Sequence, residues 1–271
     1  MRVQRSIVSD LQRQIAELER GSWRPRTATV CSKYTLSLTS WRPRLGDLPL
    51  VLMSLLRQTV RPAGITVWLS HDDLARLDPQ KRELFTAHGV QFSGCDDLCC
   101  HTKWLPAIEA GMADPFVICD DDILYPSDWF GRLVAEDRPD AFVGARAHLI
   151  RCEADGRPAP YSSWVHDVRH QSQPSQLLFI TACGGAVVHP ERIGKAFLDR
   201  KRIQAECPRA DDIWLKAAHL AAGIPCYKTK YSFPCLELPG SFESGLLRTN
   251  VDTGGNDAQM GIVADLLKSD N

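Results

Sequence analysis

The chain has 271 residues, which is long for one domain and short for two, so its length predicts one α/β domain with an appendage. Hydrophobic residues make up 44% of the chain and charged residues 24%, values typical of a globular enzyme with an apolar core. The 32 Lys and Arg residues nearly balance the 33 Asp and Glu residues. This balance argues against a general nucleic-acid-binding protein, which needs a basic face.

We expect neither a targeting segment nor a membrane-spanning helix. No run approaches the roughly 18 consecutive apolar residues that a spanning helix needs. Residues 1–14 have no apolar core, which argues against a signal peptide. The expected location is therefore the cytoplasm, with the inner face of the membrane as the alternative.

Ten cysteines raise the question of a disulfide framework. Cys119 and Cys183 lie inside apolar runs typical of strands, so in a reducing compartment we interpret them as small buried hydrophobic residues. A second group lies close together in the chain: Cys95, Cys99, Cys100 and His101. Its spacing matches no common zinc module and lacks a second pair nearby, which favours a loop with free thiols.

The first predicted element is a helix over residues 2–20. Its apolar residues form one stripe: Ile7, Leu11, Ile15 and Leu18. This stripe is narrow, which favours docking on the domain or formation of a homodimer. Peripheral association with a membrane stays open as an alternative because four arginines share the helix: Arg2, Arg5, Arg13 and Arg20.

The first half of the chain alternates between strands and helices. Strands are predicted at residues 34–38, 65–70, 90–92 and 116–119. Helices are predicted at residues 47–58, 78–88 and 103–112. Because strand and helix alternate, we expect an α/β fold with a mostly parallel central sheet flanked by helices.

The second half has a less regular pattern. Its predicted elements are a helix after Pro126, strands at 141–150 and 177–190, a helix at 211–223 and a strand from residue 224. The last thirty residues are rich in Gly, Ser, Asn and Asp, which predicts a mobile loop followed by a helix from about Asn256.

An acidic run follows the apolar strand FVIC directly. It consists of Asp120, Asp121 and Asp122, and ILYP comes after it. In open α/β sheets ligands bind outside the carboxyl ends of the strands, so these side chains are expected to face substrate. Three adjacent acids repel one another unless a cation compensates, and Mg²⁺ typically takes one or two carboxylates, waters and substrate phosphates. A solvated acidic turn is the alternative.

This run resembles the DXD motif of GT-A glycosyltransferases. The longer string DDDILYP, together with TSWRPR after the first strand, resembles bacterial polysaccharide glycosyltransferases, among them the N-acetylglucosaminyltransferase of heparosan-type capsules. FITACGGAVVHP and ADDIWLKAA are similar to matching segments of that enzyme and of the exostosin-type transferase domain. The resemblance spans residues 34–257 in consistent order, and the helix at 2–20 lies outside it.

The resemblance implies a division of the chain. Residues 1–26 would form the amphipathic helix and a linker, and residues 27–271 a single GT-A domain. Within that domain we expect a nucleotide-binding half, an acceptor half, and a C-terminal lid and helix, at about 34–125, 126–239 and 240–271. Since the helix lies outside the motifs, we expect its removal to spare transfer to a soluble acceptor.

The resemblance also assigns residues to the donor and its metal, Mn²⁺ or Mg²⁺. Asp122 would be the direct metal ligand, with Asp120 as the second DXD acid, closer to the donor ribose, and Asp121 in the same donor site. The residues that would face the nucleotide or donor are Thr39, Ser40, Arg44 and Lys103. A solvated lysine at a helix start is the alternative for Lys103.

Later residues are assigned to the sugar and the lid. Asp211 and Asp212 match the acidic pair beneath the sugar, with helix capping as the alternative from the residues alone. Gly184 and Gly185 would let the backbone approach the sugar, although glycine in a strand also marks a bulge. Three further candidates are His189, for donor or metal unless it is structural, and Arg248 and Asp257 in the lid.

The implied reaction transfers a hexose or N-acetylhexosamine from a nucleoside-diphosphate sugar to a hydroxyl of a glycan or lipid-linked glycan, in surface polysaccharide synthesis. UDP is the nucleotide that the resemblance suggests. Asp212 would act as a base in an inverting enzyme or as a stabiliser or nucleophile in a retaining one, and the resemblance favours retention. Two alternatives stay open: a nucleotidyltransferase, against which the absence of glycine from TSWRPR counts, and a noncatalytic sugar-binding module.

Overall fold

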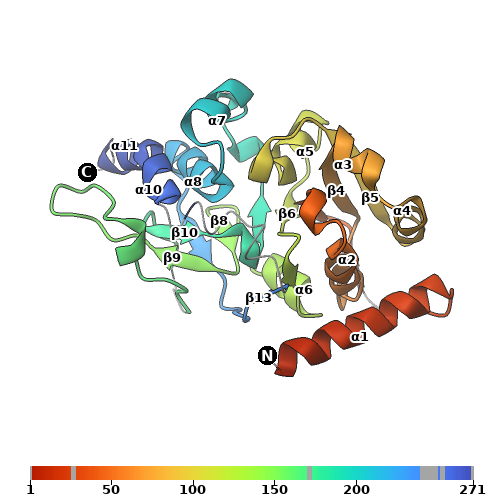
Figure 1. Cartoon of the computed structure of the whole chain (residues 1–271). Coiled ribbons are helices and arrows are strands. Elements are labelled where there is room, and N and C mark those ends of the chain that lie inside the picture. Colours follow the sequence, from red (N-terminus) through yellow and green to blue (C-terminus); the bar gives the residue numbers. More distant parts are fainter. Residues whose placement is uncertain (1, 26–28, 170–172, 239–249, 251–253, 270–271) are drawn as a thin grey trace.

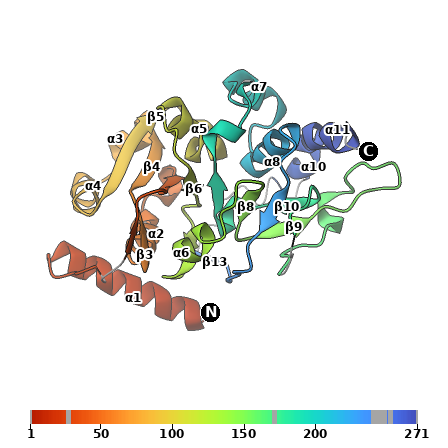
Figure 2. The same cartoon turned by 180° about the vertical axis from the view of Figure 1, so that it is seen from behind.

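The computed structural model describes residues 2–25, 29–169, 173–238, 250 and 254–269. A seven-stranded sheet crosses the molecule in the order β12-β8-β11-β6-β2-β4-β5 (Figures 1 and 2). Its strands are β2 (Thr35–Thr39), β4 (Ile65–Ser70), β5 (Val90–Cys95), β6 (Phe116–Ile118), β8 (Phe142–Gly144), β11 (Ala186–Val188) and β12 (Cys226–Lys228). Neighbouring strands are parallel except at β11, which is antiparallel to β6 and β8.

Helices flank this sheet. The α-helices are α1 (Arg2–Glu19), α2 (Leu48–Leu56), α3 (His71–Arg76), α4 (Pro79–Thr86), α5 (Leu105–Glu109), α6 (Trp129–Val134), α7 (Arg200–Glu206), α8 (Asp211–Ala221), α10 (Gly255–Gln259) and α11 (Gly261–Ser269). Short 3₁₀ turns are η1 (Arg42–Arg44), η2 (Cys99–Lys103), η3 (Tyr161–Ser163), η4 (Ala182–Gly184), η5 (Pro190–Arg192) and η6 (Lys195–Phe197). The predicted fold class, an α/β protein with a mostly parallel central sheet flanked by helices, is confirmed.

Alternation along the strands divides the core into two layers. Val117 of β6 packs in one hydrophobic cluster with α1, α2 and α6, whereas Phe116 and Ile118 pack in a second cluster with α5, α8 and α11. Side chains of a strand point alternately to its two faces, so a continuous apolar strand such as β6 serves both layers. Burial on both faces holds the carboxyl end of β6, where the acidic run begins, in a fixed position.

Three two-stranded sheets accompany the central one. They are β1 (Thr29–Cys31) with β3 (Val60–Pro62), β9 (Ala147–Leu149) with β10 (Leu178–Ile180), and β7 (Ile123–Leu124) with β13 (Leu236–Glu237). The predicted strands at 141–150 and 177–190 each split into two, because the chain leaves the central sheet for the β9–β10 pair. Gly185, with φ of 89°, makes the second turn, a conformation that favours glycine.

The apolar stripe of α1 packs against the rest of the protein. Leu11 and Leu18 are buried, and Ile7 and Ile15 are partly buried against the same core. Arg5 and Arg20 are exposed. Among helices in the described part of the chain, none has the length and apolar character needed to cross a membrane. All ten cysteines are free thiols, and Cys119 is buried.

Candidate active site

The acidic run meets the end of the neighbouring strand. β2 and β6 are adjacent and parallel, so the residues that follow them share one edge of the sheet. Ser40 donates to Asp121 Oδ2 over 2.6 Å, and Arg44 Nη1 donates to Asp121 Oδ1 over 2.6 Å. Arg44 Nη2 also lies 2.9 Å from Asp122 Oδ2. The structure therefore brings together predicted nucleotide residues and predicted metal ligands.

The three acids differ in exposure. The side chain of Asp121 is 6% exposed, whereas those of Asp122 and Asp120 are 18% and 25% exposed. Burial raises the pKa of Asp121, and the opposite charge of Arg44 and the hydroxyl of Ser40 counter that shift. Asp121 thus ties the acidic turn to β2 and η1. Asp120 and Asp122 are the two carboxylates that a ligand can reach.

Asp122 has an unusual protonation equilibrium. Burial, followed by the negative charge of Asp120, raises the pKa of Asp122 to about 7, although Arg44 opposes the shift. The carboxylate form is therefore only partly populated near neutral pH. A bound cation would stabilise that form, which is what a metal ligand of this kind requires.

The donor set fits a hard divalent ion. In the described residues, no group of three or more His, Cys, Asp and Glu side chains is arranged to hold a metal. Two reachable carboxylates, Asp120 and Asp122, suit Mg²⁺ or Mn²⁺, which complete their coordination with water and phosphate oxygens. They do not suit a structural zinc site, which needs four protein ligands.

Lys103 bridges two acidic elements. Its ammonium lies 2.6 Å from Asp120 Oδ1 and 3.1 Å from Asp211 Oδ2, and its side chain is 6% exposed. Burial lowers the pKa of Lys103, but Asp120 and Asp211 outweigh burial, so its pKa stands well above the ordinary value. Ser37 donates to the Lys103 carbonyl over 2.6 Å and thereby fixes η2 against β2. Lys103 is a buried charge within the site and is not a solvated lysine.

Asp211 and Asp212 begin α8. The residue before them, Ala210, occupies the cap position, and no side chain caps this helix end. Asp212 Oδ1 accepts a hydrogen bond from the Ala182 amide over 2.9 Å. Burial and the charge of Asp211 raise the pKa of Asp212 well above its ordinary value. Both acids therefore face the groups around η4, β6 and Lys103, and neither caps its own helix.

Gly184 and Gly185 are required by packing within the protein. A Cβ on Gly184 would lie 2.3 Å from Cβ of Arg146, and a Cβ on Gly185 would lie 2.4 Å from Cζ2 of Trp129. Trp129 Nε1 donates to the Gly184 carbonyl over 2.7 Å. These glycines let the chain at η4 pack closely against Arg146 and Trp129, whatever they do towards a ligand.

Two residues of the site carried no predicted role. The hydroxyl of Tyr125 accepts from the Asp120 amide over 2.9 Å and donates to the Cys183 carbonyl over 3.1 Å, so it connects the acidic run to η4. Arg146 Nη1 donates to Thr181 Oγ1 over 3.0 Å, and its Nη2 lies 2.6 Å from Asp167. Tyrosine within DDDILYP was a visible signal; nothing in the sequence singled out Arg146.

The remaining candidates have other partners. His189 follows β11, which runs antiparallel to β6, so it lies at the opposite edge of the sheet, where its Nε2 is 3.1 Å from Asp137. Thr39 Oγ1 donates to the Trp68 carbonyl over 2.9 Å. Asp257 accepts from the Tyr161 amide over 2.7 Å. Arg248 lies outside the described residues, as does most of the predicted lid.

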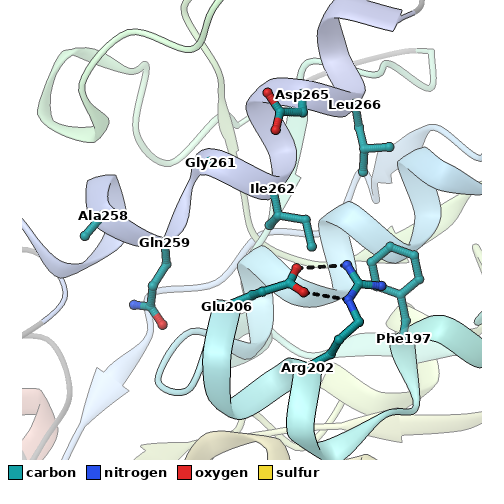
Figure 3. A pocket seen from close by; sticks show the side chains of 9 residues that line it. All are labelled: Phe197, Arg202, Glu206, Ala258, Gln259, Gly261, Ile262, Asp265 and Leu266. Atoms are coloured by element: carbon teal, nitrogen blue, oxygen red, sulfur yellow. Dashed lines mark hydrogen bonds and ion pairs between the residues drawn. The ribbon is translucent and has the colours of Figure 1, made fainter.

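A separate cavity of about 440 Å³ lies between α7 and the C-terminal helices α10 and α11 (Figure 3). Arg202 and Glu206 on its wall form a bidentate pair at 2.6 and 2.8 Å. None of the acidic residues described above lines it, so it is distinct from the candidate active site.

No protein-family model and no curated protein matches this chain. The mannosyltransferase PcManGT from Pyrobaculum calidifontis, in complex with GDP-Man and Mn²⁺, is similar in structure at 12% identity and a TM-score of 0.48, over 98% of this chain and 80% of that chain. A 4-diphosphocytidyl-2C-methyl-D-erythritol synthase is similar at 14% identity and a TM-score of 0.44, over 81% and 98% of the two chains.

The glycosyltransferase GlyE from Streptococcus pneumoniae TIGR4 is similar at 10% identity and a TM-score of 0.37, over 85% of this chain and 51% of that chain. None of these three is named as a heparosan or exostosin-type enzyme. Likeness at this level assigns no activity, so function has to be inferred from the residues of the site.

Proposed function

We propose that this chain is a metal-dependent glycosyltransferase with a nucleoside-diphosphate sugar as donor, UDP-linked by the resemblance of its motifs. The observation that supports this most strongly is the pair Asp120 and Asp122 at the carboxyl edge of β6. Both are partly exposed. Asp122 lies beside Arg44 and Asp120 beside Lys103, and Lys103 in turn pairs with Asp211 at the start of α8. Residues 27–271 would form the single transferase domain.

Asp122 and Asp120 would hold the divalent ion. Bound there, Mn²⁺ or Mg²⁺ would neutralise negative charge that develops on the departing diphosphate. Arg44 and Lys103 now balance the carboxylates, at 2.9 Å from Asp122 and 2.6 Å from Asp120. With the acids engaged by a cation, the guanidinium and ammonium groups would donate to phosphate oxygens.

Asp212 would act on the sugar or on the acceptor. Its Oδ1 is held by the Ala182 amide, which fixes the direction of the carboxyl group. As a base it would remove the proton of the acceptor hydroxyl and invert the anomeric centre. As a nucleophile or stabiliser it would support retention, which the resemblance favours. The acceptor would be a glycan or lipid-linked glycan of a surface polysaccharide, on the side of β9, β10 and η4.

Product analysis tests this proposal against a nucleotidyltransferase. The chain is incubated with UDP-N-acetylglucosamine or UDP-glucose, Mn²⁺ and glycan acceptors, and in parallel with UTP and sugar 1-phosphates. A glycosyltransferase releases UDP from the first mixture, whereas a nucleotidyltransferase releases pyrophosphate from the second. Pyrophosphate release without UDP release would overturn the proposal. Binding of UDP-sugar without turnover, over the full acceptor panel, would instead indicate a noncatalytic module.

A further inference from the structure

α1 contacts two elements that are far apart in the sequence. Along its length it packs on α2, where Leu11 and Leu18 are 1% and 2% exposed, and Asp10 lies 3.0 Å from Arg57 just after α2. At its N-terminal end the side-chain amide of Gln4 donates to the Glu237 carbonyl of β13. Both views show α1 passing beneath α2 with its first turn beside β13 (Figures 1 and 2).

α2 and β13 also contact β7 and the residues that directly follow it. Just after β7, the Tyr125 amide donates to Ser54 Oγ of α2 over 3.3 Å, and Gln58, two residues beyond the end of α2, donates to the Pro126 carbonyl over 2.7 Å. From the other side, β13 pairs antiparallel with β7. β7 is the direct continuation of the acidic run, so α1 joins the two supports of the segment that carries Asp122.

One peptide group links Gln4 to Asp122. The oxygen of the Glu237–Leu238 peptide accepts from Gln4, and the N–H of the same peptide donates to the Asp122 carbonyl over 2.7 Å. Hydrogen bonds that share a peptide group in this way polarise and strengthen one another. A change at Gln4 therefore reaches the main chain of Asp122 through a single peptide unit.

We propose that α1 supports the donor site from outside, and that Gln4 is a positioning residue that holds Asp122 in place for the divalent cation. The inference rests on the proposed function, because it concerns the metal role of Asp122. It differs from the sequence-based expectation that α1 could be removed without loss: the helix lies outside the motifs in the sequence, but it contacts β13 and the region of α2, which support the acidic run.

The test uses three variants of the full chain. Gln4→Ala removes the donor to β13, and Gln4→Lys keeps an N–H donor on a side chain that is one bond longer and flexible. Gln12→Ala is the matched control, an exposed glutamine on the same helix. Binding of Mn²⁺ in the presence of UDP is measured from the electron paramagnetic resonance signal of free Mn²⁺. Hydrogen exchange at the Leu238 amide is measured without ligand.

We expect Gln4→Ala to raise the Kd for Mn²⁺ about three- to tenfold, the effect of losing one net hydrogen bond. Leu238 exchange should rise in the same variant. Gln4→Lys should restore both readouts, and Gln12→Ala should change neither. An unchanged Kd and unchanged exchange in Gln4→Ala, or equal losses in Gln12→Ala, would overturn the inference.

A failure of the proposed function can be distinguished from a failure of this inference. If the unaltered chain does not bind Mn²⁺ in the presence of UDP, the metal role of Asp122 is wrong, and the inference about cation binding is overturned with it. Leu238 exchange needs no ligand, so it shows in that case whether Gln4 is mechanically coupled to Asp122. The two failures therefore give different combinations of results.

Discussion

Asp120, Asp121 and Asp122 are identical side chains on consecutive residues, and the protein places each in different surroundings. Asp121 is buried against Ser40 and Arg44, Asp120 pairs with Lys103, and Asp122 shares Arg44 with Asp121. Position within the run therefore separates a structural acid from two acids available to a ligand.

Asp122→Asn and Asp121→Asn are expected to fail in different ways. Asp122→Asn should fold normally and lose Mn²⁺-dependent UDP binding, because an amide cannot supply the negative charge. Asp121→Asn should lower the free energy of unfolding by about 1–2 kcal/mol, because the hydrogen bonds that Ser40 and Arg44 donate to a charged carboxylate become weaker bonds to a neutral amide. Calorimetric titration and urea denaturation measure the two effects. Retained Mn²⁺-dependent binding in Asp122→Asn would contradict the metal assignment.

His219 gives the protein a predictable sensitivity to acid. Burial lowers the pKa of His219 to about 4 from its ordinary 6.5, so between these values the unfolded chain binds the extra proton. Stability is then lost as pH falls from 6.5 towards 4, by about 2 kcal/mol at pH 5 for this group. In urea denaturation at pH 7.5 and 5, His219→Gln should lose less stability than the unaltered chain by about that amount. An equal loss would show that His219 is not responsible.

At the scale of elements, the sequence predicts helix α8 but not the contacts that its first two residues make. Asp212 points its carboxyl group at the Ala182 amide of η4, and Asp211 lies beside Lys103. The helix therefore delivers two acids to groups from β6, η2 and η4, which come from separate regions of the chain.

Asp212→Asn should leave folding and UDP binding intact and slow transfer by at least about a hundredfold, the lower range of general acid–base effects. The amide can still accept the hydrogen bond from Ala182, so the loss is chemical and not structural. Steady-state transfer kinetics with parallel calorimetry provide the measurement. Near-normal turnover would mean that Asp212 only holds η4.

The turn that ends η4 can be tested as well. Gly185 and Gly223 both have positive φ, 89° and 68°, but only Gly185 faces a neighbour, Trp129, where a Cβ would collide. Gly223→Ala should cost about 1–2 kcal/mol, for the strained backbone alone. Gly185→Ala should cost roughly 1–3 kcal/mol more, from overpacking. Urea denaturation of the two variants compares them directly, and equal losses would contradict the packing role of Gly185.

For the whole molecule, ligand binding should appear as added stability. Any ligand that binds only the folded protein stabilises it, by about 2.7 kcal/mol at a concentration of 100 times its Kd. UDP with Mn²⁺ should therefore raise the Tm well beyond either component alone, since the diphosphate and the acids share the cation. Differential scanning calorimetry with all four combinations makes the comparison. A shift that EDTA does not reduce would argue against a metal-dependent donor site.

The sequence by itself determined the features that depend on local pattern. Alternating apolar strands and helices predicted the mostly parallel sheet, and the acids after FVIC predicted a site at its carboxyl edge. The helix predicted at 2–20 is found at Arg2–Glu19, and that at 211–223 at Asp211–Ala221. Such elements follow from periodicity and from residues that are neighbours in the chain.

Tertiary structure decided how these elements combine. The pairing of β7 with β13 joins two-residue strands that are too short to leave a periodic signal, and the reversal of β11 takes His189 to the far edge of the sheet. Partners that are distant in the sequence give three residues their contacts in the structure: Cys183 for Tyr125, Asp211 for Lys103 and Glu237 for Gln4. Contacts of this kind depend on packing in three dimensions, which periodicity along one chain does not encode.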